Sequence, residues 1–293
     1  MINDNAHEIV SASYIGRPES NTVMYLAKKV EYLLKNLYEV DHCLIFCEET
    51  ISIPYDLSKK HTFIKTTNPQ FEYSKYVNEL ALNIEKKKKQ RKYVLTEGGY
   101  YIGENVSIGK NALIEPLCFI DHDVVIGDNA KIFSGAKIKN SIIGNNFIAN
   151  ENSVIGTYGY TMASDESGNN LRIPTIGKVV IGNYVEVGML ANISVGSAGN
   201  TVINDYVKID SFVHIAHDVN LHKNVRITSG TIIGGFDIIK SNVFIGINST
   251  LRNRIVVGEN SFIGMGSVVT KDVPANTTIM GNPAKNNHEK TKA

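Results

Sequence analysis

Residues 203–269 read INDYVKIDSFVHIAHDVNLHKNVRITSGTIIGGFDIIKSNVFIGINSTLRNRIVVGENSFIGMGSVV, and an aliphatic residue returns every six positions throughout. The series consists of Ile203, Ile209, Ile215, Leu221, Ile227, Ile233, Ile239, Ile245, Leu251, Val257, Ile263 and Val269. An α-helix repeats every 3.6 residues and a strand every two, so neither sustains this period. A triangular coil does, because each hexad supplies one short strand and one corner, and three hexads close a coil. The stretch therefore predicts a left-handed parallel β-helix in which residues eighteen positions apart are stacked.

The same period begins at Ile102, and one hexad is a residue short before Ile143. Two segments interrupt it, TYGYTMASDESGNNLRIPT at 157–175 and ISVGSAGNTV at 193–202. The first is long enough for a functional loop. Four positions after each aliphatic comes a second inward position, mostly small or β-branched. Asp237 breaks that rule, and the sequence offers no explanation for it.

The N-terminal region lacks the hexad pattern and predicts a small α/β domain. We expect an amphipathic helix at 22–37, short strands at 43–46 and 62–66, and a second helix with Asn68 as N-cap and Pro69 in its first turn. The basic run KKKKQRK then marks a helix end or a solvated linker. The predicted protein is mainly β, with an α/β nucleotide-binding domain at 1–92, the β-helix at 93–285 and a tail at 286–293.

Composition excludes several functional classes. With a formal net charge of +1, the chain lacks the excess of basic residues that binding to DNA or RNA usually requires. Cys43, Cys47 and Cys118 show neither disulfide nor metal-ligand spacing, so we expect core packing in a reducing, cytoplasmic setting. The N-terminal residues carry no signal-peptide pattern, and no apolar run is long enough to span a bilayer.

His217 is the strongest catalytic candidate. The hexad phase turns Ile215 and Val219 inward, so His217 should face outward near a corner. A neutral imidazole can take a proton from an attacking amine near pH 7. Asp218 either orients that imidazole or is a solvated corner carboxylate, and the sequence leaves both open. No serine or cysteine lies in a nucleophile elbow. Direct attack by an amine on a thioester is therefore favoured over a covalent enzyme intermediate.

The coil repeat places Gly235 and then Asn253 in the column beneath His217. Gly234 and Gly235 remove side-chain bulk there, which would leave a groove for a pantetheine chain. The alternative is that both glycines only form a corner.

The stretch IPTIGKVVIGNYVEVGMLANISVGSAGNTVINDYVKIDSFVHIAHDVNL (173–221) resembles the core of the UDP-3-O-acylglucosamine N-acyltransferase family. In the block Asp210–Asp218, the catalytic histidine of that family falls on His217, with Asp218 beside it. TTNPQFEYSKYV (66–77) resembles the uridine-contacting domain of the family. That resemblance implies that Asn68 and Phe71 lie near a nucleotide base, although Asn68 also reads as a plain N-cap.

Three features depart from that family. Residues 193–196 read ISVG in place of I-D-R-G, and a second, downstream histidine is replaced at or near Arg254. The helical extension that serves an acyl carrier protein is not found. Instead GMGSVVTKDVPANTTIMGNPAK (264–285) resembles CoA-dependent sugar acetyltransferases and nucleotide-amino-sugar N-acyltransferases of surface-polysaccharide pathways.

The resemblance implies a homotrimer whose sites lie between subunits. Tyr158 and Tyr160 in the 157–175 loop are candidates for stacking on the sugar or base, and His214 is a further candidate for substrate binding. Lys285 is a candidate contact for a CoA phosphate. A metal-dependent carbonic anhydrase of this fold would need a histidine set such as His122, His214, His217 and His222. The amino-sugar motifs disfavour it, and we predict no metal.

The sequence thus predicts an N-acyltransferase that moves a short acyl group from acyl-CoA, as co-substrate, to the amine of a UDP- or dTDP-linked amino sugar. The first alternative is the lipid A enzyme itself, using a hydroxyacyl carrier protein. The second is a β-helix without catalysis that serves as a scaffold.

Overall fold

The computed structural model describes residues 9–197 and 199–286, and their contacts form two compact units. The N-terminal unit comprises the described residues up to Gln90, residues 159–177 and the segment 197–199. The β-helix unit comprises 91–158, 178–196 and the described residues from Asn200 onward. The long interruption predicted as a loop therefore groups largely with the N-terminal unit, which the division at residue 92 did not anticipate. The tail predicted at 286–293 lies, apart from Asn286, outside the described residues.

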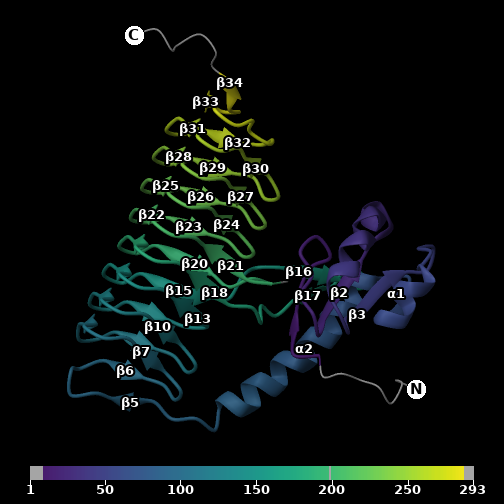
Figure 1. The fold of residues 1–293 in the computed structure, drawn as a ribbon, viewed down its shortest axis with the longest axis horizontal. Helices are drawn as coiled ribbons and strands as arrows, with labels where there is room; N and C mark the ends of the chain where they lie inside the picture. The colour runs from purple at the N-terminus through teal and green to yellow at the C-terminus, as the bar shows by residue number, and fades with distance from the viewer. Residues whose placement is uncertain (1–8, 198, 287–293) are drawn as a thin grey trace. The chain divides into compact units, whose positions relative to one another are not determined.

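The β-helix unit has three faces, each a sheet of very short strands (Figure 1). The first face holds β7 (Ser107–Ile108), β10 (Val125–Ile126), β13 (Ser141–Ile143), β18 (Val179–Ile181), β21 (Thr201–Ile203), β24 (Asn220–Leu221), β27 (Ile238–Ile239) and β30 (Val256–Val257). The second holds β8 (Leu113–Ile114), β11 (Lys131–Ile132), β14 (Ile148–Ala149), β19 (Glu186–Val187), β22 (Lys208–Ile209), β25 (Arg226–Ile227), β28 (Phe244–Ile245), β31 (Phe262–Ile263), β33 (Thr278–Met280) and β34 (Lys285–Asn286). The third holds β5 (Val94–Leu95), β6 (Tyr101–Ile102), β9 (Phe119–Ile120), β12 (Lys137–Ile138), β15 (Val154–Thr157), β20 (Asn192–Ser194), β23 (His214–Ile215), β26 (Ile232–Ile233), β29 (Thr250–Leu251) and β32 (Val268–Val269).

Successive coils pair in parallel and in register. In the C-terminal half, β24 pairs with β27 so that Leu221 lies opposite Ile239, eighteen residues on. The short hexad is absorbed without loss of phase, since Ile126 lies opposite Ile143. The predicted fold class, a left-handed parallel β-helix with a small N-terminal α/β domain, is confirmed.

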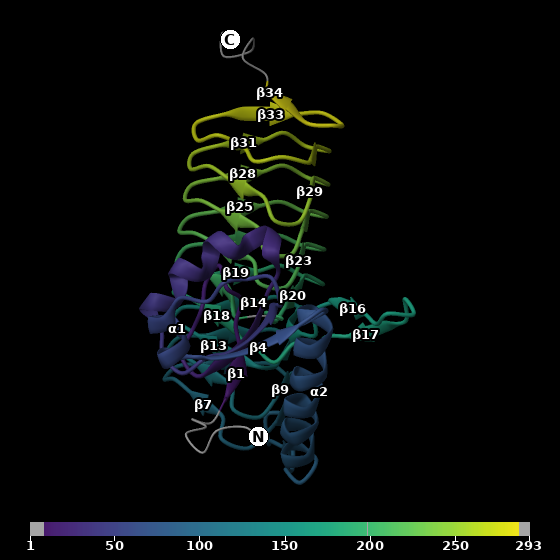
Figure 2. The same cartoon turned by 90° about the vertical axis from the view of Figure 1, so that its right-hand side faces the viewer.

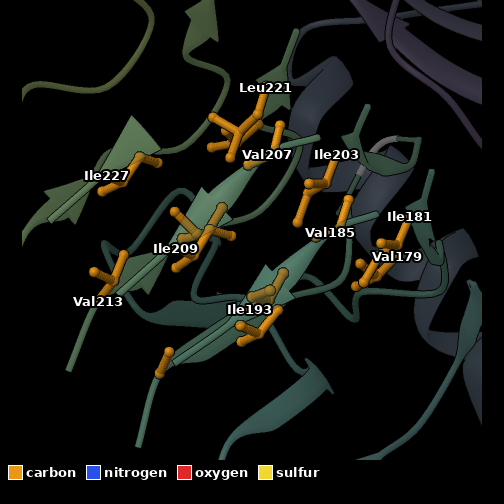
Figure 3. Packing of buried hydrophobic residues seen from close by; sticks show 14 of the residues in the cluster. Val179, Ile181, Val185, Ile193, Ile203, Val207, Ile209, Val213, Leu221 and Ile227 are labelled. Atoms are coloured by element: carbon orange, nitrogen blue, oxygen red, sulfur yellow. The ribbon is translucent and has the colours of Figure 1, made fainter. Parts of the chain in front are cut away.

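The inward aliphatics fill the prism. Figure 3 shows Ile181, Ile203 and Leu221 in one column of the interior, with Val185 and Val207 in another. All five are at most 3% exposed. Burying each such side chain stabilises the fold by roughly 1.5–3 kcal/mol. The interior is therefore packed with side chains, and function must lie on the outside of the coils.

The N-terminal unit contains a parallel sheet in the order β1 (Ser11–Ala12), β2 (Thr22–Leu26), β3 (Leu44–Glu48) and β4 (Thr62–Thr66). Its helices are η1 (Lys28–Glu39), α1 (Tyr55–Lys60) and α2 (Pro69–Lys88). The strands predicted at 43–46 and 62–66 are confirmed, as is the helix that Asn68 caps. The same unit includes the hairpin β16 (Met162–Ser164) and β17 (Asn170–Arg172), which packs beside α2 (Figure 2).

The helix predicted at 22–37 is wrong over its first turn and a half. Residues 22–26 form the strand β2, and a 3₁₀ helix begins only at Lys28. The strand lies between β1 and β3, where Val23, Met24 and Leu26 are fully buried. Because both faces of the strand are covered, its sequence is a continuous apolar run without alternation. Hydrophobic periodicity cannot distinguish such a strand from a buried helix.

The three cysteines are free and buried, as predicted for core residues. Burial raises the pKa of the Cys43, Cys47 and Cys118 thiols, which disfavours the reactive thiolate. Among the helices of the described residues, none is long and apolar enough to cross a membrane.

Asp237 is fully buried in a column that Val219 occupies in the preceding coil and Ile255 in the next. Its Oδ1 accepts the Ile255 N–H at 3.0 Å, and Oδ2 has no hydrogen-bond partner within the described residues. Burial raises the pKa of this carboxyl to about 7, and the hydrogen bonds from Ile255 and Gly234 offset part of that rise. The group is thus a buried proton-binding site in an interior made mostly of aliphatic side chains.

This carboxyl makes a specific contribution to pH-dependent stability. In the folded chain Asp237 keeps its proton up to about pH 7, whereas in the unfolded chain it ionises near pH 4. The unfolded state therefore binds fewer protons between these values. The contribution of Asp237 to the free energy of unfolding falls as pH rises from about 4 to 7 and is constant above.

Asp237→Asn removes the ionisation and keeps the shape. We expect its unfolding free energy to exceed that of the wild type by on the order of 4 kcal/mol at pH 8 and by little at pH 4. Denaturant titrations at the two pH values measure this, and an equal difference at both would contradict it.

Candidate active site

His217 lies at the corner where the chain passes from β23 on the third face to β24 on the first. Its side chain is 14% exposed, and its Nδ1 lies 2.8 Å from Oδ2 of Asp218. Asp218 itself is buried, with 2% of its side chain exposed. Of the two sequence readings of Asp218, the geometry therefore favours the one in which its carboxylate orients the imidazole.

The backbone of Asp218 is left-handed at this corner, with φ at 61°. That conformation is uncommon outside glycine, and aspartate and asparagine tolerate it best. The Asp218 N–H donates to the Thr201 hydroxyl at 2.9 Å. The corner thus turns the carboxylate back toward the preceding side chain.

The His217–Asp218 pair has the arrangement of a general base with its orienting group. With Asp218 ionised, Nδ1 carries the ring proton and its N–H donates a hydrogen bond to the carboxylate. In this tautomer Nε2 is the ring nitrogen with a lone pair that can take a proton from a substrate, and the carboxylate stabilises the imidazolium that forms.

Gly235 lies directly beneath the imidazole, as the coil repeat predicts. A Cβ at this position would come within 2.8 Å of both Cε1 and Nε2 of His217. At Gly234, a Cβ would come within 2.4 Å of the Asn253 backbone nitrogen. Gly235 thus makes room for the His217 ring itself. Gly234 makes room for the next coil, which agrees with the reading of this glycine as part of a corner.

Phe236 and Arg254 are neighbours of the site that the sequence reasoning did not select. The Phe236 ring meets the His217 ring edge to face at 5.2 Å, and the Arg254 guanidinium lies 4.1 Å from the centre of the Phe236 ring. Counting eighteen residues on from Asp218 gives Phe236, and eighteen more gives Arg254. The column that begins at Asp218, next to the column of His217, would therefore have predicted both. They place a cation at the same corner as the proposed base.

The other predicted residues of this unit are more scattered. His214 lies on β23, and burial, then the nearby His217, lowers the pKa of its imidazole. Asn253 is exposed in the coil after Gly235. Lys285 lies on β34, which pairs with β33 on the second face. Its predicted contact with a CoA phosphate stays a prediction.

The N-terminal unit holds the residues that the resemblance assigned to a nucleotide base. The Asn68 side chain accepts the Phe71 N–H at 3.1 Å and donates to the Ser164 carbonyl at 3.2 Å. It is therefore both the N-cap of α2 and a link to the hairpin. The Phe71 ring packs partly buried, with the Lys75 ammonium 5.2 Å from its centre.

The two loop tyrosines fall in different units. Tyr160 belongs to the N-terminal unit, is 76% exposed, and has the Arg172 guanidinium 5.5 Å from its ring centre. Tyr158 is the last residue of a β-helix segment and is 64% exposed. The structure thus brings Tyr160 into the same unit as Asn68 and Phe71, while Tyr158 stays with His217.

A hollow of about 590 Å³ lies elsewhere in the β-helix unit, along the second face. Its lining includes Lys208, Asp210, Arg226 and Phe244, and it does not include His217. Within the described residues, no group of three or more histidine, cysteine, aspartate or glutamate side chains is placed to hold a metal ion.

Comparison with known proteins shows which proteins this chain resembles. The family described as "Bacterial transferase hexapeptide (six repeats)" matches residues 99–140 and 238–271. The bifunctional protein GlmU of Listeria monocytogenes serotype 4a is 31% identical over 191 residues, covering 59% of this chain and 37% of GlmU. A UDP-3-O-acylglucosamine N-acyltransferase of Methylorubrum populi is 32% identical over 152 residues, covering 52% of this chain and 43% of that enzyme. The chain thus spans less than half the length of these two relatives.

Solved structures show the same architecture. LpxA of Bacteroides fragilis, a UDP-N-acetylglucosamine acyltransferase, is 27% identical with a TM-score of 0.59, over 66% of this chain and 73% of LpxA. The UDP-N-acetylglucosamine acyltransferase of Campylobacter jejuni has a TM-score of 0.58 over 64% of this chain and 72% of its own, and at 24% identity it supports the fold alone. Two stretches of the chain thus match the hexapeptide-repeat transferase family. The chain is related to GlmU and to the UDP-3-O-acylglucosamine N-acyltransferases.

The dyad geometry predicts the protonation pattern of His217. In Asp218→Asn, the carboxamide can present an N–H to Nδ1, which moves the ring proton to Nε2 and blocks its lone pair. Nitrogen chemical shifts of ¹⁵N-labelled histidine should assign the Nδ1–H tautomer to the wild type and the Nε2–H tautomer to the variant. Identical His217 tautomers in the two proteins would show that Asp218 does not orient the ring.

Proposed function

We propose that the protein is an N-acyltransferase that moves a short acyl group from acyl-CoA to the amine of a UDP- or dTDP-linked amino sugar, for surface polysaccharide synthesis. The observation that carries the proposal is the His217–Asp218 pair, a buried carboxylate 2.8 Å from an imidazole at a coil corner. Kinship with nucleotide-sugar acyltransferases supports the same chemistry.

The reaction proposed for this pair is direct aminolysis of a thioester. The substrate amine attacks the thioester carbonyl carbon while His217 Nε2 takes a proton from the nitrogen. The new C–N bond forms, the C–S bond breaks, and the thiolate leaves with a proton returned from the imidazolium. Asp218 holds the ring and stabilises its charged form during the transfer.

We assign nucleotide recognition to the N-terminal unit, where Asn68, Phe71 and Tyr160 supply an amide and two aromatic rings. Aromatic rings suit stacking on a uracil or thymine base, and an amide suits hydrogen bonding to its edge. Lys75 and Arg172, each over one of these rings, add cations suited to a diphosphate. His214 and Tyr158 remain candidates for sugar contacts.

For the donor, the packed interior is the relevant constraint. Because aliphatic side chains fill the prism, an acyl chain has to lie along the outside of the coils. We place the donor along the corner column that continues from His217 through Gly235 to Asn253, with Lys285 as a phosphate contact. A short acyl group suits an exterior groove better than a long fatty chain, which would expose much apolar surface to water.

We further propose that the protein acts as a homotrimer. A flat-sided prism buries little of a bulky nucleotide sugar, so a second subunit would have to complete the pocket. Light scattering combined with an assay at nanomolar concentration tests this. Full activity of a monomer would rule it out.

The lipid A enzyme, which would use a hydroxyacyl carrier protein as donor, is the second candidate function. The 32% identity to a UDP-3-O-acylglucosamine N-acyltransferase favours it specifically. The acyl donor distinguishes the two candidates.

Replacing His217 tests the base directly. His217→Ala should lower turnover by roughly 10²–10⁴-fold, the usual contribution of a positioned base, with little effect on acceptor binding. His222→Ala, a histidine following β24, serves as the matched control and should retain turnover. Near-normal turnover of His217→Ala would leave deprotonation to solvent or substrate and refute the assignment.

A donor panel tests the acyl specificity. We expect acetyl- to hydroxybutanoyl-CoA to be used with a UDP- or dTDP-amino sugar. Lys285→Ala should raise the Michaelis constant for these donors with turnover nearly intact, because a phosphate contact contributes to binding alone. Lys110→Ala, an exposed lysine of an early coil, is its control. Robust activity with a long hydroxyacyl carrier protein, and none with any short acyl-CoA, would assign the enzyme to the lipid A pathway instead.

A further inference from the structure

The corners of the β-helix follow a regular hydrogen-bonding rule. At most corners a residue with positive φ donates its N–H to a backbone carbonyl of the preceding coil. In regular coils that acceptor lies nineteen residues earlier, as for Asp123 to Glu104, Phe236 to His217 and Arg254 to Gly235. These bonds satisfy amides that would otherwise be unpaired at the turn.

Asp218 departs from this rule. Its φ of 61° matches that of the other corner residues, but its N–H donates to the side-chain hydroxyl of Thr201. The residue nineteen places earlier is Gly199, in the segment 197–199 that groups with the N-terminal unit. Where the chain leaves the coil, the hydroxyl of Thr201 takes the place of the backbone acceptor. Thr201 is fully buried on β21.

A second His–Asp dipeptide in the same chain shows that sequence alone does not produce the catalytic pair. His122–Asp123 follows β9 on the same face, and Asp123 has a φ of 60°. There the Asp123 carboxylate binds Arg91, and His122 Nδ1 accepts the Glu104 N–H at 2.7 Å. Asp123 is 56% exposed, whereas Asp218 is 2% exposed and bound to its histidine.

We propose that Thr201 is a positioning residue for the His217–Asp218 pair, through the hydroxyl that accepts the Asp218 N–H. The expected effect on kcat rests on the proposed function, but the expected effect on the His217 tautomer does not. Without this acceptor, the buried N–H of Asp218 loses its hydrogen bond to Thr201, which is costly enough to shift the backbone. Because the Asp218 carboxylate reaches Nδ1 from that backbone, a shift there separates the pair.

Three variants test the role of Thr201. Thr201→Val keeps the shape and removes the acceptor, while Thr201→Ser keeps the hydroxyl. Thr231→Val is the matched control, because Thr231 is also fully buried and its hydroxyl donates to the Gly246 carbonyl at 3.2 Å. We expect Thr201→Val to lower kcat by about 10–100-fold with KM within about 3-fold, as misplacement of a catalytic group does. Thr201→Ser should restore kcat to within about 3-fold of the wild type, and Thr231→Val should leave kcat unchanged.

The readout that does not require activity is the ¹⁵N spectrum of His217. The wild type and Thr201→Ser should show the Nδ1–H tautomer, and Thr201→Val a mixture of the two tautomers. An unchanged His217 tautomer together with unchanged kcat in Thr201→Val would overturn the inference while leaving the proposed function intact. If the wild type acylates no amino sugar with any donor, the proposed function fails, and the spectrum still decides the role of Thr201.

Discussion

Hydrogen bonds between successive coils are the constraint on which the rest of this structure depends. In the regular coils each short strand pairs in parallel with the strand one coil away, so that residues eighteen positions apart lie in one column. This stacking packs the aliphatics into the prism. It also builds the outer columns, in which Gly235 follows His217 and Phe236 follows Asp218. The stacking of the coils therefore decides which side chains become neighbours at the site.

The geometry of the proposed catalytic pair arises where the repeat is disturbed. The chain leaves the coil at 197–199, and the amide of Asp218 is then bonded to a side chain, Thr201. At the undisturbed corner of Asp123, the same dipeptide forms no pair of this kind. The faces of a regular prism are smooth. At an irregular coil, a side chain can replace a backbone hydrogen-bond acceptor and so change the geometry of one corner. Asp237 is a different irregularity, a buried carboxyl whose cost in stability the surrounding packing tolerates.

The sequence predicted the β-helix and the column beneath His217, because a period of six has few structural solutions and stacking follows from it arithmetically. It left the direction of the Asp218 carboxylate open, since at the corner of Asp123, which has the same backbone angle, the carboxylate binds Arg91 instead. It did not reveal Thr201, because counting by eighteen fails where the coil is interrupted. The strand at 22–26 was mistaken for a helix, since burial on both faces erases the alternation that identifies strands.

The central claim is that His217 Nε2 receives the proton of the substrate amine. A crystal structure of the dead-end complex with CoA and a nucleotide-linked amino sugar tests it most directly. If His217 is the base, the sugar amine lies about 3 Å from His217 Nε2, with the CoA thiol at the same corner. An amine bound away from His217, for example in the hollow beside Arg226 and Phe244 on the second face, would contradict it.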